Sequence, residues 1–191
     1  MAQHNTADSY FISLDFQKAF DTIEYKWLNL VLQFQNFPLT FCKYIAQMQH
    51  HASSQIQVNQ FITNPVPIKR GVRQDDPLSL TIFILALNPL LTYIQENRYI
   101  SPVPNPTKYP PKLTAYADDI TLSISKPLSL KEVFKTITLL QKASGLQLSP
   151  TKSTGVSTNK KLKLSNDFNI HWHSDCITPL NITIVSPQPV A

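Results

Sequence analysis

The stretch KLTAYADDITLSIS, residues 112–125, is the most informative part of the chain. Small and apolar residues alternate with polar ones on both sides of two adjacent acids, Asp118 and Asp119. Alternation with a period of two is typical of strands, so the stretch predicts a β-hairpin with the two acids at its tight turn. Aspartate is common in turns, but a tight hairpin prefers glycine at the second position, and adjacent like charges repel each other. A simple turn and a cation-binding site both explain the pair.

The composition predicts an ordinary globular domain. The 191 residues are 42% hydrophobic and 15% charged, with a formal net charge of +5. This length suits a single domain with a sizeable core. The modest basic charge permits a nucleic-acid partner without implying one.

Three features predict an intracellular protein, in the nucleus or the cytoplasm, that is not secreted and has no membrane partner. Two cysteines are too few for a disulfide framework. The polar N-terminus lacks the pattern of a signal peptide. The longest apolar run, residues 81–91, is too short to span a bilayer and contains Pro89, so we expect a buried helix there.

Hydrophobic periodicity and turn residues favour an α+β fold over a doubly wound α/β fold. The predicted elements are a strand at 10–16, a helix at 20–34, a hairpin at 54–70, a helix at 78–94, a proline-rich connector at 101–111, a helix at 130–144 and a strand pair at 168–172 and 177–185. Asp21 and Glu24 predict a capping box for the first helix. Asn59 and Gln60 predict the turn of the first hairpin, and Gly145 predicts the end of the last helix.

A third acid changes the interpretation of the pair. Asp15 lies close to the C-terminal end of an apolar strand, so three carboxylates lie at predicted strand ends. Mg²⁺ prefers such oxygen ligands and is usually completed by water and substrate phosphates. Two such ions about 3.5–4 Å apart can activate an attacking hydroxyl and stabilise a leaving oxygen. We therefore predict that the three carboxylates converge at a site for phosphoryl transfer.

Three other residues have metal-binding chemistry but no such pattern. His171, His173 and Cys176 lack a fourth ligand at a usable spacing. Alternate histidines in a strand are more typical of a surface, and we expect them there.

Four motifs, in order, resemble the reverse transcriptases of non-LTR (LINE-type) retrotransposons. They are FISLDFQKAFDTIE at 11–24, GVRQDDPLSL at 71–80, LTAYADDI at 113–120 and SGLQLSPTKS at 144–153. The resemblance implies a right-hand polymerase palm over residues 1–153, in which an antiparallel sheet with a catalytic hairpin packs on helices. Residues 154–191 resemble a degenerate primer-grip segment followed by a tail.

The resemblance also implies catalytic and metal-binding roles. Asp15 and Asp118 would hold the catalytic ions, with Asp119 as a weaker or occasional ligand. The main-chain carbonyl of Phe16 would also face a metal. Lys152 falls on the lysine that is proposed in such polymerases to donate a proton to the leaving pyrophosphate.

Four further residues are implied to bind substrate. Phe20 falls where the family places an aromatic under the sugar as a steric gate, although periodicity alone equally predicts a helix core residue. Tyr116 would lie near the primer terminus, or be an ordinary strand aromatic. Arg73 and Gln74 would contact the incoming nucleotide and the template, and without the motif they would belong to a solvated loop.

The implied activity is RNA-directed DNA polymerisation. Its substrates would be an RNA template, a DNA primer and deoxynucleoside triphosphates, with two Mg²⁺ or Mn²⁺ ions bound together with substrate. The primer 3′-hydroxyl would attack the α-phosphate in line, and pyrophosphate would leave.

The chain also departs from the family pattern. Asp75 stands where glycine is common, and Gln60 replaces a turn glycine. Pro179, Leu180 and Asn181 replace the usual primer-grip residues. We expect no counterpart of the family's fingers, thumb and endonuclease segments. A catalytically inactive palm remnant, at most binding nucleic acid or serving as a structural domain, is therefore the alternative, and whether this chain is an active enzyme alone stays open.

Overall fold

The computed structural model describes residues 8–74, 76–104, 110–158, 170–174, 176–177 and 184–185. Its helices are α1 (Ala19–Thr22), α2 (Tyr25–Phe34), α3 (Leu39–His50), α4 (Pro77–Glu96) and α5 (Pro127–Ser144). The central sheet contains β1 (Ser9–Leu14), β6 (Ser101–Pro102), β7 (Leu113–Tyr116), β8 (Asp119–Ser125), β9 (Thr154–Ser157) and β10 (His171–His173). The short strands outside it are β2 (Ser53–Ser54), β3 (Gln57–Val58), β4 (Phe61–Ile62), β5 (Val66–Pro67), β11 (Cys176–Ile177) and β12 (Ile184–Val185).

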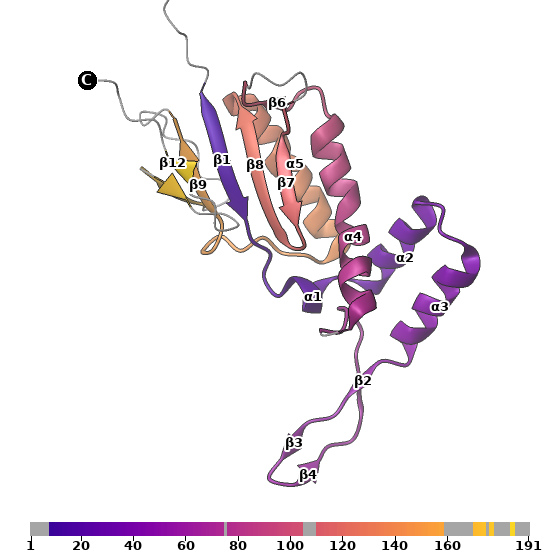
Figure 1. Cartoon of the computed structure of the whole chain (residues 1–191). Coiled ribbons are helices and arrows are strands. Elements are labelled where there is room, and N and C mark those ends of the chain that lie inside the picture. Colours follow the sequence, from indigo (N-terminus) through magenta and orange to yellow (C-terminus); the bar gives the residue numbers. More distant parts are fainter. Residues whose placement is uncertain are drawn as a thin grey trace, which may run out of the picture.

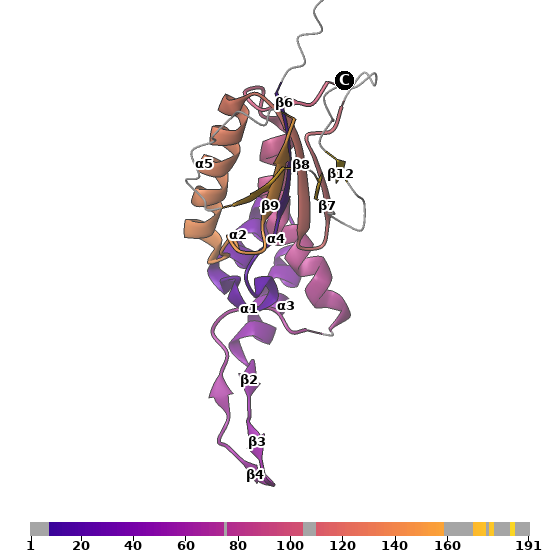
Figure 2. The same cartoon turned by 90° about the vertical axis from the view of Figure 1, so that its left-hand side faces the viewer.

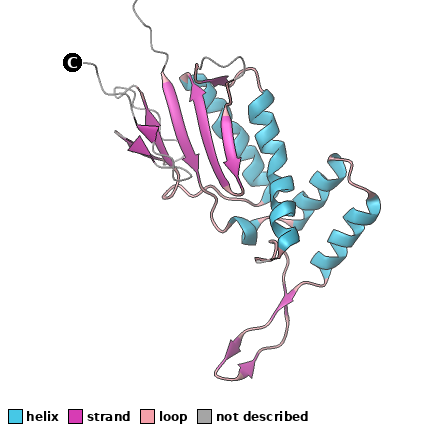
Figure 3. Cartoon of the chain, viewed as in Figure 1, coloured by secondary structure: helices cyan, strands magenta, loops and turns pink. Residues whose placement is uncertain are grey.

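The fold has two layers, a mixed sheet and the helices packed on one of its faces (Figures 1 and 3). The strand order is β10-β9-β1-β8-β6, and β7 also pairs with β8. All of these pairs are antiparallel except that of β10 with β9. This mixture of helices with a largely antiparallel sheet confirms the α+β prediction.

Alternation along the two central strands separates a core face from an open face. On β1, Tyr10, Ile12 and Leu14 are fully buried, and Phe11 and Ser13 between them are only half-buried. Leu14 pairs with Ile120 on β8, which is also fully buried. Because side chains alternate between the two faces of a strand, a residue next to a buried one points away from the helices. Asp15, which follows Leu14, and Asp119, which precedes Ile120, are in such positions.

Helix α4 is the central helix of the core. Its buried residues are Ser79, Ile82, Phe83, Ala86, Leu87, Leu90 and Ile94. The helix begins one residue before and ends two residues after the predicted 78–94. Pro77 in the first turn favours the earlier start, as does the side chain of Asp76, which accepts a hydrogen bond from the Leu78 N–H at 2.9 Å. Its 20 residues are long and apolar enough to span a bilayer by length and composition alone, contrary to our expectation from the 81–91 run. Core helices of soluble proteins pass the same test, and α4 packs against α2, α5 and β7.

The predicted hairpin forms an arm that projects from the body of the molecule (Figure 2). Within it β2 pairs with β5 and β3 pairs with β4. Asn59 and Gln60 form the turn, with φ of 47° and 70°. This confirms the predicted turn, and Gln60 adopts there the left-handed conformation that usually favours glycine.

Backbone pairing between distant segments overrules two local predictions. The helix predicted at 20–34 is broken into α1 and α2, because Glu24 pairs with Arg70 and its N–H donates to the Ser144 carbonyl at 2.8 Å. The capping box is therefore wrong: Lys18 and Glu24 are the N-cap residues, and neither caps through its side chain. Gly145 ends α5 with φ of 77°, as predicted.

Two connections also differ from the sequence prediction. Within the proline-rich segment, Ser101 and Pro102 pair with the edge of β8, so part of it is strand and not connector. In the tail, β10 pairs with β9 and, among the described residues, not with the segment predicted as its partner. That segment forms a separate pair, β11 with β12. The predicted primer-grip residues 179–181 lie outside the described residues, as does Asp75.

Candidate functional site

The hairpin of β7 and β8 carries the paired acids at its tip. Tyr116 pairs with Asp119 across the hairpin, so the two-residue loop consists of Ala117 and Asp118. Ala117, with φ of 54°, takes the left-handed conformation. The predicted hairpin is confirmed, but the placement of both acids in its turn is wrong by one residue. Asp119 is the first residue of β8 and is exposed, whereas Asp118 is half-buried.

Asp15 lies beside this hairpin although about a hundred residues separate it in sequence. The β1–β8 register ends at Leu14 opposite Ile120. Continuing that register by one residue places Asp15 opposite Asp119. The strand ends of β1 and β8 therefore bring the three predicted acids to one edge of the open face.

The electrostatics of Asp15 reflect this convergence. Burial raises the pKa of the Asp15 carboxyl, and the neighbouring negative charges of Asp118 and Asp119 raise that pKa further. Lys152 acts in the opposite direction, since its positive charge lowers the pKa of Asp15. Asp15 Oδ1 is buried and has no hydrogen-bond partner among the described residues. A desolvated carboxylate with one unpartnered oxygen binds a proton or a cation more readily than a solvated carboxylate does.

The loop between α5 and β9 places Lys152 near Asp15. The Gln17 N–H donates to the Gln147 carbonyl at 2.8 Å, and the Ser149 N–H donates to the Asp15 carbonyl at 2.7 Å. These bonds hold residues 147–149 alongside the segment that follows β1. Lys152 lies in the turn just beyond and is exposed. The loop thus sets the distance between a predicted metal ligand and the predicted proton donor.

The same bonds orient the carbonyl of Phe16. Phe16 forms an antiparallel bridge with Leu148, and the hydrogen bonds of that bridge are made by the flanking residues Asp15 and Gln17. The N–H and C=O of Phe16 therefore point away from the loop, toward the side on which β8 lies. Its side chain is 3% exposed and belongs to the core. The main-chain oxygen, not the ring, is the part of Phe16 that the site can use.

Three of the remaining predicted residues, Phe20, Arg73 and Gln74, lie on two segments that hydrogen bonds join to each other. The Phe20 carbonyl accepts a hydrogen bond from the Val72 N–H at 2.6 Å, which ties α1 to the segment containing Arg73 and Gln74. The Gln74 side chain donates to the Asp21 carboxylate at 3.3 Å. Phe20 is half-buried and stacks on Phe83 of α4, with ring centroids 4.6 Å apart. Both interpretations of Phe20 therefore stay compatible with its position. Tyr116, with 76% of its surface exposed, lies on the hairpin itself.

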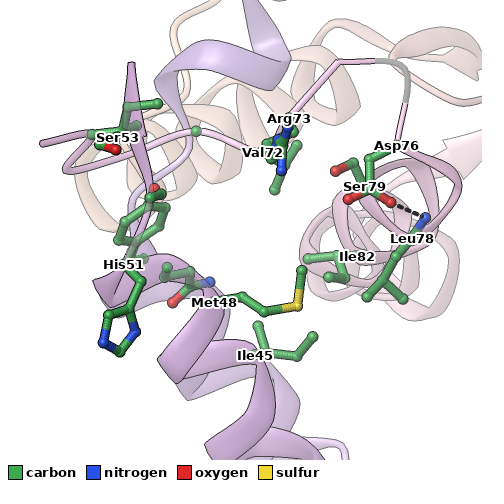
Figure 4. Close-up of a pocket in the computed structure, with 15 residues that line it drawn as sticks. Ile45, Met48, His51, Ser53, Val72, Arg73, Asp76, Leu78, Ser79 and Ile82 are labelled. Atoms are coloured by element: carbon green, nitrogen blue, oxygen red, sulfur yellow. Dashed lines mark hydrogen bonds between the residues drawn. The ribbon is translucent and has the colours of Figure 1, made fainter. Parts of the chain in front are cut away.

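Arg73 lines a cavity of about 330 Å³ next to this group (Figure 4). The cavity lies between α3, the base of the arm and the start of α4. Ile45, Met48 and Ile82 give it an apolar wall, and Arg73 and Asp76 supply charge (Figure 4). Sequence reasoning did not predict it, because its walls come from three separated segments.

The carboxylates fit a metal that substrate helps to hold better than a closed metal cage. Among the described residues, no three His, Cys, Asp or Glu side chains are grouped closely enough to hold an ion by themselves. Mg²⁺ is usually held by one or two carboxylates, with waters and substrate phosphates as the other ligands. The buried, unpartnered Oδ1 of Asp15, the Asp118 carboxylate and the Phe16 carbonyl are oxygen donors of this kind. His171 and His173 on β10 are exposed, as expected.

The raised pKa of Asp15 predicts that Asp15→Asn stabilises the metal-free chain at neutral pH. A carboxyl whose pKa is higher in the folded chain than its ordinary value of 3.8 destabilises the folded chain once it ionises, and this loss of stability grows as the pH rises from 3.8 through the folded pKa. Asparagine does not ionise and therefore removes this loss. The unfolding free energy of the variant should therefore exceed that of the wild type at pH 7, and the gain should shrink as the pH falls toward 3.8. Urea unfolding across this pH range measures it.

Glu96→Gln is a matched control, because it removes an equal charge from an exposed position at the end of α4. It should give no comparable gain that disappears in acid. Destabilisation of the chain by Asp15→Asn at pH 7 would contradict the description of Asp15 as a desolvated carboxylate whose charge Lys152 compensates only in part.

Comparison with known proteins identifies the family of the chain. The family described as "Reverse transcriptase (RNA-dependent DNA polymerase)" matches residues 1–177. The chain is 30% identical over 184 residues to the "Transposon TX1 uncharacterized 149 kDa protein" of Xenopus laevis, covering 93% of this chain and 14% of that protein. It is 30% identical over 147 residues to a "Retrovirus-related Pol polyprotein from type-1 retrotransposable element R2" of Popillia japonica, covering 76% of this chain and 20% of that protein. The chain thus spans a fifth or less of these two relatives.

Solved structures share the fold at low sequence identity. Apo telomerase from Candida tropicalis superposes with a TM-score of 0.65 and 15% identity, covering 94% of this chain and 34% of that one. Telomerase from Candida albicans gives a TM-score of 0.66 and 10% identity, covering 93% and 29%. These similarities confirm the predicted polymerase palm fold. Together with the family match and the LINE-type retrotransposon relatives, they show that the chain belongs to the reverse transcriptase family.

Proposed function

We propose that the chain supplies the palm of an RNA-directed DNA polymerase, which copies an RNA template onto a DNA primer from deoxynucleoside triphosphates. The observation that carries the proposal is the convergence of Asp15, Asp118, Asp119 and Lys152 at one edge of the open sheet face. Two negative charges and one positive charge act on the carboxyl of Asp15, whose Oδ1 is buried. Such an arrangement suits a reaction in which negative charge must be neutralised and a proton delivered.

Each residue has a proposed task. Asp15 and Asp118 would hold two Mg²⁺ or Mn²⁺ ions, with Asp119 in support and the Phe16 carbonyl as a further oxygen ligand. When bound, such ions activate the primer hydroxyl and stabilise the leaving oxygen. Lys152, exposed beside Asp15, would donate a proton to the departing pyrophosphate.

The second group would orient the substrates. Phe20, held by its stack on Phe83, would lie under the sugar of the incoming nucleotide. Arg73 and Gln74, joined to α1 through Val72 and Asp21, would contact the nucleotide and the template. Tyr116 is exposed beside the acids and would approach the primer terminus. Stacking and phosphate contacts of this kind position a nucleic acid without reading its sequence.

Divalent cations should stabilise the chain through the carboxylates. A ligand that binds only the folded state, at ten times its dissociation constant, adds about 1.4 kcal/mol, or roughly 3–6 °C for a chain of this size. We expect MgCl₂ or MnCl₂ to raise the melting temperature by such an amount, and Asp118→Asn to abolish most of the rise. Differential scanning fluorimetry with and without metal measures both.

Glu96→Gln again serves as the control, because it removes one exposed carboxylate far along α4. It should keep the full metal-dependent rise. A melting temperature that is unchanged in millimolar metal, or an equal rise in Asp118→Asn, would favour the interpretation of the acids as a simple turn.

The inactive palm remnant, at most binding nucleic acid or serving as a structural domain, is the second proposal, and one departure of the sequence favours it. Asp75 stands where the family commonly has glycine, beside Gln74 in the sequence, and adds a negative charge that opposes nucleotide binding. A palm of this kind depends on substrate to complete its metal site. If the chain binds metal but not primer and nucleotide, it is a remnant with an intact ligand set.

A further inference from the structure

Two buried serines hold both main-chain polar groups of Asp15. The Asp15 N–H donates to the Ser153 hydroxyl oxygen at 3.1 Å, and the Asp15 carbonyl accepts from the Ser149 N–H at 2.7 Å. The Ser153 N–H in turn donates to the Ser149 carbonyl at 2.9 Å, which closes the turn between them. We call Ser149 to Ser153 and these three bonds the serine clasp.

The clasp joins two residues that the proposed reaction uses. Ser149 and Ser153 are 2% and 0% exposed, whereas Lys152, between them in sequence, is exposed. The buried ends of the turn are fixed against Asp15, and the exposed part presents the lysine. Lys152 is close enough to lower the pKa of the Asp15 carboxyl, so the clasp also sets the geometry of this charge pair.

We propose that Ser153 is a positioning residue for Asp15, and that it holds the Lys152 turn in register with the metal ligand. The inference rests on the proposed function, because it concerns the same carboxylate. Asp15 directly follows the last residue of β1, and its N–H donates to Ser153, the residue directly before β9. Without the Ser153 hydroxyl, this part-buried N–H loses its partner, and the start of the metal-binding segment can shift.

The Ser153 hydroxyl is assigned a role in the site because it binds the main chain of Asp15, a proposed metal ligand. Groups that orient metal ligands typically change metal affinity 10–100-fold when they are removed. A hydroxyl that only stabilises the fold should change stability without changing metal affinity. The chain offers a matched example: Ser129 is also 0% exposed, and its hydroxyl accepts the Ser101 N–H at 2.9 Å. That bond joins α5 to β6, and neither residue belongs to the site.

The experiment compares Ser153→Ala, Ser153→Thr and Ser129→Ala in the full chain with the wild type. Mn²⁺ affinity is measured by electron paramagnetic resonance of the free ion, and amide exchange at Asp15 by hydrogen–deuterium exchange without metal. Ser153→Ala should raise the Mn²⁺ dissociation constant about tenfold or more and accelerate exchange at Asp15. Ser129→Ala should lose comparable stability and keep both values, and Ser153→Thr, which keeps the hydroxyl, should recover most of the affinity.

The two measurements separate the inference from the proposed function. Unchanged exchange at Asp15 in Ser153→Ala would overturn the clasp. Faster exchange with unchanged Mn²⁺ affinity, or an equal loss of affinity in Ser129→Ala, would overturn the positioning role. Absence of Mn²⁺ binding by the wild type would instead overturn the proposed metal site and with it the positioning role, while metal-free exchange would still decide whether the clasp exists.

Discussion

Phe83→Ala should destabilise the chain by about 3–5 kcal/mol, which lowers the melting temperature by roughly 6–20 °C. Phe83 is fully buried on α4 and stacks on Phe20 with an interplanar angle of 26°. The substitution leaves a cavity in the middle of the core and removes an aromatic pair. Because whole domains are stable by about 5–15 kcal/mol, a loss of this size removes a large part of the total. Urea or thermal unfolding measures it.

The chain contains a closely matched control for this substitution. Phe61→Ala removes the same atoms from the tip of the arm, where Phe61 is 81% exposed, and should cost less than about 0.5 kcal/mol. Phe83→Leu keeps most of the volume and should fall between the two. Equal losses in Phe83→Ala and Phe61→Ala would mean that the arm tip is packed and that the core assignment of α4 is wrong.

The consequence for the site is that Phe20 depends on the core. Its ring rests on Phe83, and its carbonyl binds the segment that carries Arg73. The packing of Phe20 against the core agrees with the interpretation from periodicity. Its role under the sugar stays a proposal, and that role would depend on the same packing.

Most of the fold could be predicted because its signals are local. The helix at 78–94, the turn at Asn59 and Gln60 and the end of α5 at Gly145 follow from apolar periodicity and turn chemistry. The errors come from pairing between distant segments. Glu24 bonds to Ser144, and β10 joins β9, and no local pattern contains that information.

The acids of the candidate site could be predicted from the sequence, and the residues that hold them in place could not. Asp15 and the pair at 118–119 could be predicted from strand ends and from the family motif. The exact loop residues could not, because the choice depends on the cross-strand register that pairs Tyr116 with Asp119. Ser149 and Ser153 were missed because their partner, Asp15, lies more than 130 residues away, and because the sequence around them is that of an ordinary polar loop. The only local signal was their closeness to Lys152.

The full chain of residues 1–191 should give no measurable extension of a DNA primer on an RNA template. Binding a primed template and a nucleotide costs several kcal/mol of lost freedom, which extensive contacts must offset. The chain spans 14% and 20% of the two relatives, so most of the length of those proteins has no counterpart here. The described site supplies Lys152 and Arg73 as cations, against three carboxylates and a negatively charged triphosphate.

Asp75 should weaken nucleotide binding further. It stands where the family commonly has glycine, next to Gln74, and adds both a β-carbon and a negative charge. A like-charge contact near 4 Å costs on the order of 4 kcal/mol at an effective dielectric constant of about 20, and even 1.4 kcal/mol is a tenfold loss in affinity. Asp75→Gly alone should therefore leave the chain inactive.

Both expectations are tested by assaying primer extension with labelled primer in Mg²⁺ and in Mn²⁺, beside an active reverse transcriptase. Synthesis by the wild-type chain that disappears in Asp118→Asn would overturn the expectation, and would mean that the palm binds its substrates without help from surfaces found in the longer relatives.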